Sequence, residues 1–317
     1  MACCKRTVGC HPTLLLAGFL SFALPGAAAD FVWPGHETKS PKKCALVLTY
    51  EDGLRSQLDI AVPQLDAAGF HGTFFLDSAV TPLTMRRWRA IANAGHELGN
   101  HALFSPCPRA VLPGRRNYFA EDYDTERILT EIGVMNAVLF GIDGRETRTY
   151  SAPCGQTLVG GVDYTDALRA SGLVKYARVG GDSMNSIVVD VSRLDVFRVP
   201  SYAPLDKPGG AALIAYAERV RAAGGLGVLQ FHGVGGDYLE VSREAHQQLL
   251  DWLSKHPDVW VAPFQEVMDY VAAACSTGKP CARQALMPPA KGRTCLNPMA
   301  FNFRATNAAE ASLGQSQ

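Results

Sequence analysis

The chain has 317 residues, of which 47% are hydrophobic and 19% are charged, and its formal net charge is zero. This is an ordinary globular composition rather than a disordered or fibrous one, and the length suits one large α/β domain or two small ones. A chain without net charge has no long-range field that draws it to nucleic acid or to an anionic membrane, so a role driven by phosphate contacts is disfavoured.

The N-terminal segment is typical of a signal peptide. Lys5 and Arg6 precede an apolar run over residues 13–24, and three alanines follow at 27–29. The run is shorter than the roughly 20 residues that a membrane-spanning helix needs, and a buried core helix is the alternative reading. We expect residues 1–29 to be a signal peptide and 30–43 a linker. The mature protein is then exported, either secreted or periplasmic, with no stable membrane span.

The elements follow in an alternating pattern, with short apolar runs as strands and longer amphipathic runs as helices. In chain order we expect a strand at 45–50, a helix at 57–68, a strand at 72–76, a helix at 84–94, a strand at 96–99, a helix at 121–140, a strand at 147–151, a helix at 163–170, a strand at 173–178, a helix at 211–223, a strand at 227–231, a helix at 242–256, a strand at 259–262 and a helix at 264–274.

This alternation predicts a parallel sheet with helical crossovers. About seven strand–helix units in one domain favour a barrel over an open sheet. The weakest part of the count lies between residues 178 and 208, which contain no clear helix. We place the domain at residues 44–274 and interpret 275–317 as a Cys-containing tail rather than as a second domain.

The cysteines agree with export. Of the nine, three leave with the signal peptide and six remain in the mature chain: Cys44, Cys107, Cys154, Cys275, Cys281 and Cys295. In an oxidising compartment an even number suggests disulfides, but spacing alone does not give their connectivity. No C-x-x-C pair is present, so a cysteine-rich zinc site is disfavoured.

Polar residues that can carry chemistry follow three of the predicted strands. Glu51 and Asp52 follow the first strand, His101 follows the third, and His232 follows the strand at 227–231. In a parallel barrel the carboxyl ends of the strands meet at one rim, so these side chains should converge there. Carboxylates and imidazoles around a divalent cation point to metal-assisted hydrolysis, with a second carboxylate as general base and a histidine as general acid.

The motifs around these residues resemble those of the polysaccharide deacetylase (NodB-homology) family. The first motif of the family, T-F/Y-D-D-G, corresponds to TYEDG at 49–53, and G-H-E-I-G-N-H corresponds to GHELGNH at 95–101. YSAPCG at 150–155 is similar to F-R-x-P-Y-G, LQFH at 229–232 to L-x-x-H, and TFF at 73–75 to the A-T-F-F strand. The motifs match in order and position over most of the mature chain.

The resemblance implies a distorted (β/α)7 barrel in a single domain, and a hydrolase that removes acetyl groups from an N-acetylated polysaccharide or oligosaccharide. By position, Asp52 and His101 would bind a divalent metal, commonly Zn²⁺. Glu51 would be the catalytic base and His232 the general acid. The backbone N–H of Cys154 would lie at the oxyanion position.

The sequence departs from the family pattern at three positions. The base is a glutamate, Glu51, where the family has an aspartate. Ser105 stands where the family has a second metal-binding histidine, and a catalytic zinc site normally has three protein ligands. Ser151 replaces the arginine of the third motif. Arg178, at the end of the next predicted strand, either supplies the missing cation to the site or is a surface or salt-bridged arginine.

Three further residues lie next to the motifs. Cys107 and Cys154 either form a disulfide that borders the pocket or are buried small apolar residues. Tyr238, in a glycine-rich loop after His232, either stacks on a sugar ring or caps the barrel. We count Arg178 and Tyr238 as candidate substrate-binding residues.

The leading hypothesis is a metal-dependent polysaccharide N-deacetylase, a hydrolase of carbon–nitrogen bonds other than peptide bonds. The second hypothesis is a catalytically degenerate relative that binds carbohydrate without turnover, motivated by Ser105 and Ser151. A third is hydrolysis of a non-sugar amide on the same scaffold.

Overall fold

The computed structural model describes residues 31–35, 41–111, 118–181 and 183–276. All of them belong to the first of two units of the chain, residues 1–281. The expected signal peptide, part of the expected linker and the tail beyond residue 276 lie outside the described residues. The side chains of Cys275, Cys281 and Cys295 lie outside them as well.

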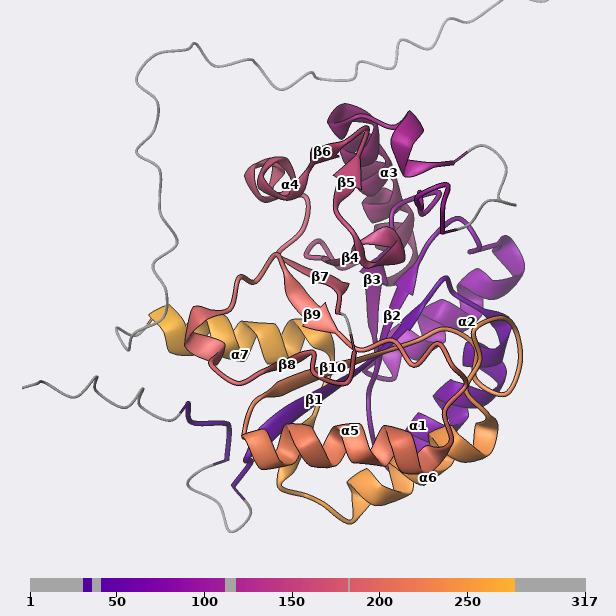
Figure 1. Cartoon of the computed structure of the whole chain (residues 1–317). Coiled ribbons are helices and arrows are strands. Elements are labelled where there is room, and N and C mark those ends of the chain that lie inside the picture. The colour runs from indigo at the N-terminus through magenta and orange to yellow at the C-terminus, as the bar shows by residue number, and fades with distance from the viewer. Residues whose placement is uncertain (1–30, 36–40, 112–117, 182, 277–317) are drawn as a thin grey trace, which may run out of the picture. The chain divides into compact units, whose positions relative to one another are not determined.

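Parallel strands form the frame of the domain (Figure 1). In chain order they are β1 (Cys44–Glu51), β2 (Thr73–Leu76), β3 (Glu97–Asn100), β4 (Thr149–Ser151), β7 (Tyr176–Gly180), β9 (Val199–Ser201) and β10 (Leu226–Phe231). Each strand pairs in parallel with the next as far as β9, and β10 pairs in parallel with β1.

The ring of strands closes between β9 and β10 through a single bridge. The Tyr202 N–H donates to the Val228 carbonyl at 2.8 Å, and the Gln230 N–H donates to the Tyr202 carbonyl at 2.9 Å. Only this one bridge joins the two strands within the described residues, whereas β10 and β1 are in register over six residue pairs. The predicted distorted (β/α)7 barrel is confirmed.

The other described strands are short. β8 (Ile187–Val188) runs antiparallel to β10, and β11 (Val259–Val261) pairs with the N-terminal half of β1. β5 (Leu158–Val159) and β6 (Val162–Asp163) form a separate antiparallel hairpin. The sequence patterns did not predict β5, β6, β8 and β9. The first three span two residues each, which is too short to show a hydrophobic period, and β9 is interrupted by a proline.

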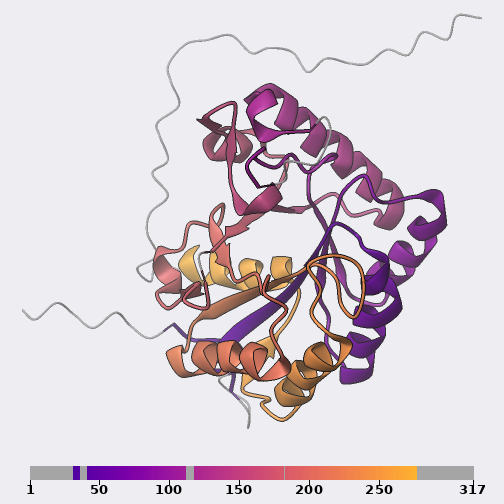
Figure 2. The same ribbon diagram turned by 45° about the vertical axis from the view of Figure 1, so that its right-hand side comes forward.

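Helices other than α7 pack around the outside of the strands (Figure 2). A π-helical turn (Gln57–Ala61) leads into α1 (Val62–Ala68), followed by α2 (Pro82–Asn93), α3 (Thr125–Asp143), α4 (Thr165–Ser171), α5 (Gly210–Ala223), α6 (Arg243–Ser254) and α7 (Phe264–Ser276). Side chains cap the N-termini of α2, α3 and α6, and Asp124 starts α3 later than the expected residue 121. None of the described helices combines the length and apolarity needed to cross a bilayer.

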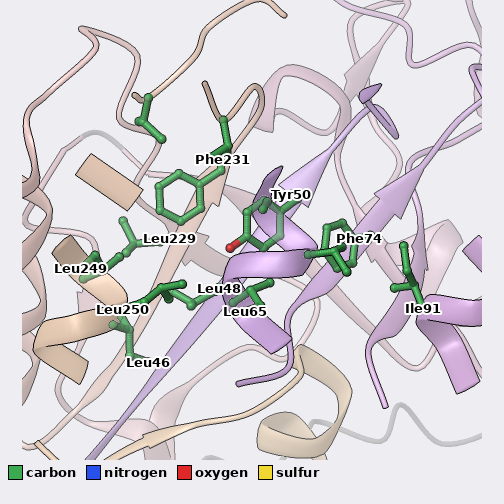
Figure 3. Close-up of a cluster of buried hydrophobic side chains, with 14 of the residues drawn as sticks. Leu46, Leu48, Tyr50, Leu65, Phe74, Ile91, Leu229, Phe231, Leu249 and Leu250 are labelled. Carbon is green, nitrogen blue, oxygen red and sulfur yellow. The ribbon is translucent and has the colours of Figure 1, made fainter. Parts of the chain in front are cut away.

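The two faces of β1 have different surroundings. Leu46, Leu48 and Tyr50 point outward and pack against α1, α5 and α6. The Tyr50 ring lies between Phe74 and Phe231, with ring centroids 4.8 and 5.4 Å away (Figure 3). Burial of these side chains contributes roughly 1.5–3 kcal/mol each, which makes this layer the main apolar support of the barrel wall.

The opposite face of β1 points into the barrel. Ala45 and Val47 share a buried cluster with inner residues of β2, β7, β9 and β10 and with the apolar side of α7. Because α7 supplies Phe264, Val267 and Met268 to this cluster, it fills the amino-terminal end of the barrel interior. Beyond Val47, the inward face of β1 continues with Thr49 and then Glu51, so Glu51 is the inner residue of this strand closest to the carboxyl-terminal rim.

Candidate active site

The four predicted strand-end residues meet at the carboxyl-terminal rim. The Nε2 atom of His101 lies 3.5 Å from Oδ1 of Asp52, and its Nδ1 lies 3.7 Å from Oε1 of Glu51. Nε2 of His232 lies 3.3 Å from Oε2 of Glu51 and 3.9 Å from Oδ2 of Asp52. Residues separated by up to 181 positions thus form one cluster of two carboxylates and two imidazoles.

Backbone geometry turns the two adjacent carboxylates toward the same place. Asp52 has a φ of 70°, in the left-handed region that residues other than glycine rarely adopt. In a continued strand Glu51 and Asp52 would point to opposite faces of the sheet. The left-handed residue ends β1 and allows both side chains to reach His101 and His232, so the backbone strain lies at the site itself.

Glu51 is buried, with 1% of its surface exposed, and both of its carboxylate oxygens are engaged. Oε1 accepts hydrogen bonds from the Arg178 guanidinium and the Ser151 hydroxyl. Oε2 accepts one from the Gln230 amide at 2.5 Å and faces His232. The carboxylate is therefore fixed by three inner residues of β4, β7 and β10.

These surroundings set the charges at the site. Burial alone would raise the pKa of Glu51, but the Arg178 guanidinium and the neighbouring His101 and His232 hold this pKa well below 4.5. Burial opposes protonation of His232, but the hydrogen bond and negative charge of Glu51, together with Asp52, raise the pKa of His232 above 6.5. An ionised Glu51 therefore sits beside a histidine that favours its protonated form.

Asp52 and His101 are arranged as two metal ligands would be. Nδ1 of His101 lies 2.9 Å from the Ser151 carbonyl, which can only accept, so Nδ1 carries the proton and the lone pair of Nε2 faces Asp52. Two ligands about 2.1 Å from one tetrahedral zinc lie about 3.4 Å apart. The observed 3.5 Å between Nε2 and Oδ1 of Asp52 fits this spacing.

A third protein ligand is missing. The Ser105 hydroxyl, at the expected third position, donates to the His101 carbonyl at 2.7 Å and also lies 3.3 Å from Oδ2 of Asp77. Across the ranges that the structure describes, no three His, Cys, Asp or Glu side chains are arranged to hold a metal ion. The two residues present fit a metal, but they do not form the three-ligand site typical of a catalytic zinc.

Two loops of the rim are covalently joined. Cys107, after β3, and Cys154, after β4, form a disulfide with their Cα atoms 5.5 Å apart, which is one of the two alternatives that the sequence left open. Cys154 also has a left-handed backbone, with φ 51°. The disulfide therefore holds the peptide whose N–H the family resemblance assigns to the oxyanion.

The two candidate substrate-binding residues occupy very different places. Tyr238 is 52% exposed, and its hydroxyl donates to Oδ2 of Asp52. Arg178 is fully buried beneath Glu51, so in this structure its guanidinium binds protein groups and is not presented to a ligand. Of the two, only Tyr238 is exposed at the rim.

Several polar residues of the cluster were missed at the sequence level. Gln230 lies within a strand that reads as apolar, two positions before His232, on the same strand face. Asp77 directly follows β2, as Asp52 follows β1, and burial and the nearby Asp52 carboxylate raise its pKa. Gln57 donates to the carbonyls of Glu51 and His232 at 2.5 and 3.0 Å. A polar residue at or just beyond a buried strand end was the available signal for the first two.

Comparisons with known proteins show which family and which fold the chain resembles. The polysaccharide deacetylase family model matches residues 38–172, which include the first three motifs, and the predicted resemblance is confirmed. No curated protein matches the chain.

Two of the solved structures that resemble the chain have a similar fold. A polysaccharide deacetylase structure from Mycobacterium smegmatis, described there as putative, is 18% identical with a TM-score of 0.57, covering 86% of this chain and 99% of that one. The Bc1960 peptidoglycan N-acetylglucosamine deacetylase is 15% identical with a TM-score of 0.50, covering 72% of this chain and 88% of that one. A pseudoenzyme of the CE4 family from Bacillus anthracis is 16% identical with a TM-score of 0.45, covering 73% and 67%.

Proposed function

We propose that this protein is a hydrolase of carbon–nitrogen bonds other than peptide bonds, and that it removes acetyl groups from an N-acetylated polysaccharide or oligosaccharide. The observation that carries the proposal is the meeting of Glu51, Asp52, His101 and His232 within 3.9 Å contacts at one rim of the barrel. The match to the polysaccharide deacetylase model supports the reaction class.

In this proposal Glu51 takes a proton from the attacking water, and His232 donates a proton to the leaving amine. The 3.3 Å contact between Oε2 and Nε2 of His232 is longer than the Glu51 contacts to Arg178, Ser151 and Gln230, and we expect water to enter at this contact. The raised pKa of His232 keeps a proton available for the amine. The N–H of Cys154 stabilises the oxyanion.

Asp52 and His101 would hold a divalent cation, with Zn²⁺ as the expected metal. When bound, such a cation would polarise the acetyl carbonyl. Tyr238, whose hydroxyl donates to Asp52, would contact the sugar. Because Arg178 and its neighbours lower the pKa of Glu51, this carboxylate is a weak base, and we expect slow turnover.

The direct test is acetate release from N-acetylglucosamine oligomers, measured with and without added Zn²⁺ and compared with a His232→Ala variant. Acetate above the level of the variant supports the proposal. If no N-acetylated glycan gives more acetate than the variant does, the hydrolase proposal is wrong.

A second candidate function is carbohydrate binding without turnover. The specific observation that favours it is Ser105, which stands at the third ligand position with its hydroxyl bonded to Asp77 and to the His101 carbonyl. It predicts glycan binding in calorimetry without acetate release, and little metal in the purified protein by elemental analysis. A stoichiometric transition metal would count against it.

We also propose that the mature chain begins after Ala29 and acts outside the cytoplasm, secreted or periplasmic. Disulfides such as Cys107–Cys154 persist in oxidising compartments. N-terminal sequencing of protein recovered from the producing cells tests this, because an intact leader on the functional protein would contradict it.

A further inference from the structure

Arg178 lies at the centre of a buried polar network inside the barrel. Its Nη1 atom donates to the Ser201 hydroxyl and to Oε1 of Gln230, each at 2.6 Å. Its Nη2 atom donates to the Ser151 hydroxyl at 2.5 Å and to the Glu51 carboxylate. Five strands, β1, β4, β7, β9 and β10, each contribute one member of this network.

A buried network of this kind contributes little to the free energy of unfolding. Moving a guanidinium and a carboxylate out of water costs several kcal/mol per ion, and a buried pair often does no better than apolar residues of similar volume. Apolar side chains could fill this part of the barrel, as Ala45 and Val47 do nearer its amino-terminal end. The ion pair therefore points to a role at the rim, where Glu51 contacts His232.

The network also explains Ser151. Ser151 and Arg178 are direct register partners on the neighbouring strands β4 and β7. The third motif of the resembled family has an arginine at position 151, and here the arginine stands one strand further along the ring. A serine in β4 leaves room for the guanidinium and donates its own hydroxyl to the same carboxylate oxygen.

We propose that Arg178 is the positioning residue for Glu51, and that the guanidinium has moved from β4 to β7 with Ser151 as the compensating small residue. The effect of Arg178 on catalysis rests on the proposed function, but its effect on the geometry of Glu51 and His232 does not. Arg178 acts through Glu51 and does not touch the substrate.

The test compares Arg178→Ser, Arg178→Lys and the exchange variant Ser151→Arg/Arg178→Ser. Arg148→Ser is the matched control, because Arg148 forms another buried ion pair, with Asp143, outside this network. Each variant is examined by thermal unfolding, by the ¹⁵N-resolved imidazole resonances of His232 and by kcat and KM for acetate release.

For Arg178→Ser we expect a shift of the His232 resonances and a loss of about 10²-fold in kcat with little change in KM, because a small misplacement of a catalytic group costs about that much. Lysine keeps the charge but cannot bond two pairs of acceptors, so Arg178→Lys should fold and lose about tenfold. The exchange variant should restore the resonances and recover at least about tenfold over Arg178→Ser. Arg148→Ser should unfold at a lower temperature with unchanged kcat.

The outcomes separate the two proposals. If no variant and no wild-type protein releases acetate, the proposed function fails, and the His232 resonances still test the positioning role. If Arg178→Lys leaves both the resonances and kcat unchanged, or if the folded exchange variant restores neither, the positioning role is overturned.

Discussion

Glu51 and Glu97 are two glutamates buried to almost the same degree inside one barrel, with 1% and 3% of their surfaces exposed. Glu51 ends β1 at the rim and is paired with Arg178. Glu97 begins β3, where its carboxylate accepts hydrogen bonds from Thr73 at 2.9 Å, from Thr149 and from the Gln265 N–H at 2.8 Å.

Their pKa values shift in opposite directions. For Glu51 the nearby positive charges outweigh burial and lower the pKa, whereas for Glu97 burial dominates its neutral donors and raises it. Burial alone thus does not define a reactive carboxylate. The opposite pKa shifts follow from the cations that lie close to Glu51. The variants below remove the groups that make the two glutamates differ.

The largest effect should come from removing His232, whose imidazole contacts the Glu51 carboxylate. We expect His232→Ala to lower kcat for acetate release about 10²–10⁴-fold, the usual contribution of a general acid. His256→Ala is the control, because His256 stacks on Trp252 at the end of α6 and should leave kcat unchanged. Equal losses in the two variants would contradict the role of His232.

Next in size is the loss of the ion pair itself. Glu51→Gln leaves the Arg178 charge buried without its partner, and we expect a loss of about 3–5 kcal/mol in the free energy of unfolding. Glu97→Gln removes only hydrogen bonds between neutral donors and a carboxylate, and should cost about 1 kcal/mol near neutral pH. Urea unfolding of both variants measures the two losses in the free energy of unfolding. Equal losses would contradict the prediction.

A third experiment adds a donor at the rim. A histidine at position 105 would give Asp52 and His101 a third partner, so Ser105→His should bind Zn²⁺ at least about tenfold more tightly than wild type. Ser254→His, on α6, serves as the control for non-specific binding by an added imidazole. Zinc competition with a chromophoric chelator measures both, and equal affinities would show that position 105 does not face the other ligands.

The smallest effect is a pH dependence that isolates Glu97. Because its pKa is raised above 4.5 in the folded protein, the folded state binds more protons than the unfolded state between 4.5 and that raised pKa, and wild-type stability falls as pH rises through this window. Glu97→Gln lacks this loss. Its stability relative to wild type should therefore rise with pH, by at most about 1.4 kcal/mol per pH unit. Urea unfolding at several pH values tests the sign.

The sequence predicted the barrel and the meeting of its strand-end residues because both follow from periodic patterns. Long runs such as 45–50 show their burial directly, and parallel strands bring their carboxyl ends to one rim. The patterns did not predict which residue supplies the cation that Ser151 lacks. Arg178 and Ser151 become partners only through the β4–β7 register, and nothing local in either strand encodes that register.

The same limit explains the missed elements. β9 (Val199–Ser201) contains a proline and spans three residues, so it carries no recognisable strand signal, yet its Ser201 holds the buried arginine. Its place in the ring is set by β7 and β10 on either side, which is information from the tertiary structure.

Among the described strands, the single bridge between β9 and β10 is one of two weakly paired joints in the ring, the other being the single β3–β4 pair. Ser201 lies on one side of the β9–β10 joint and Gln230 on the other, and the Arg178 guanidinium bonds to both at 2.6 Å. The Arg178 side chain therefore also links β9 to β10 through hydrogen bonds. Amide hydrogen exchange at Tyr202 and Gln230 should be faster in the Arg178→Ser variant. Separation of β9 from β10 and displacement of Glu51 would then occur together.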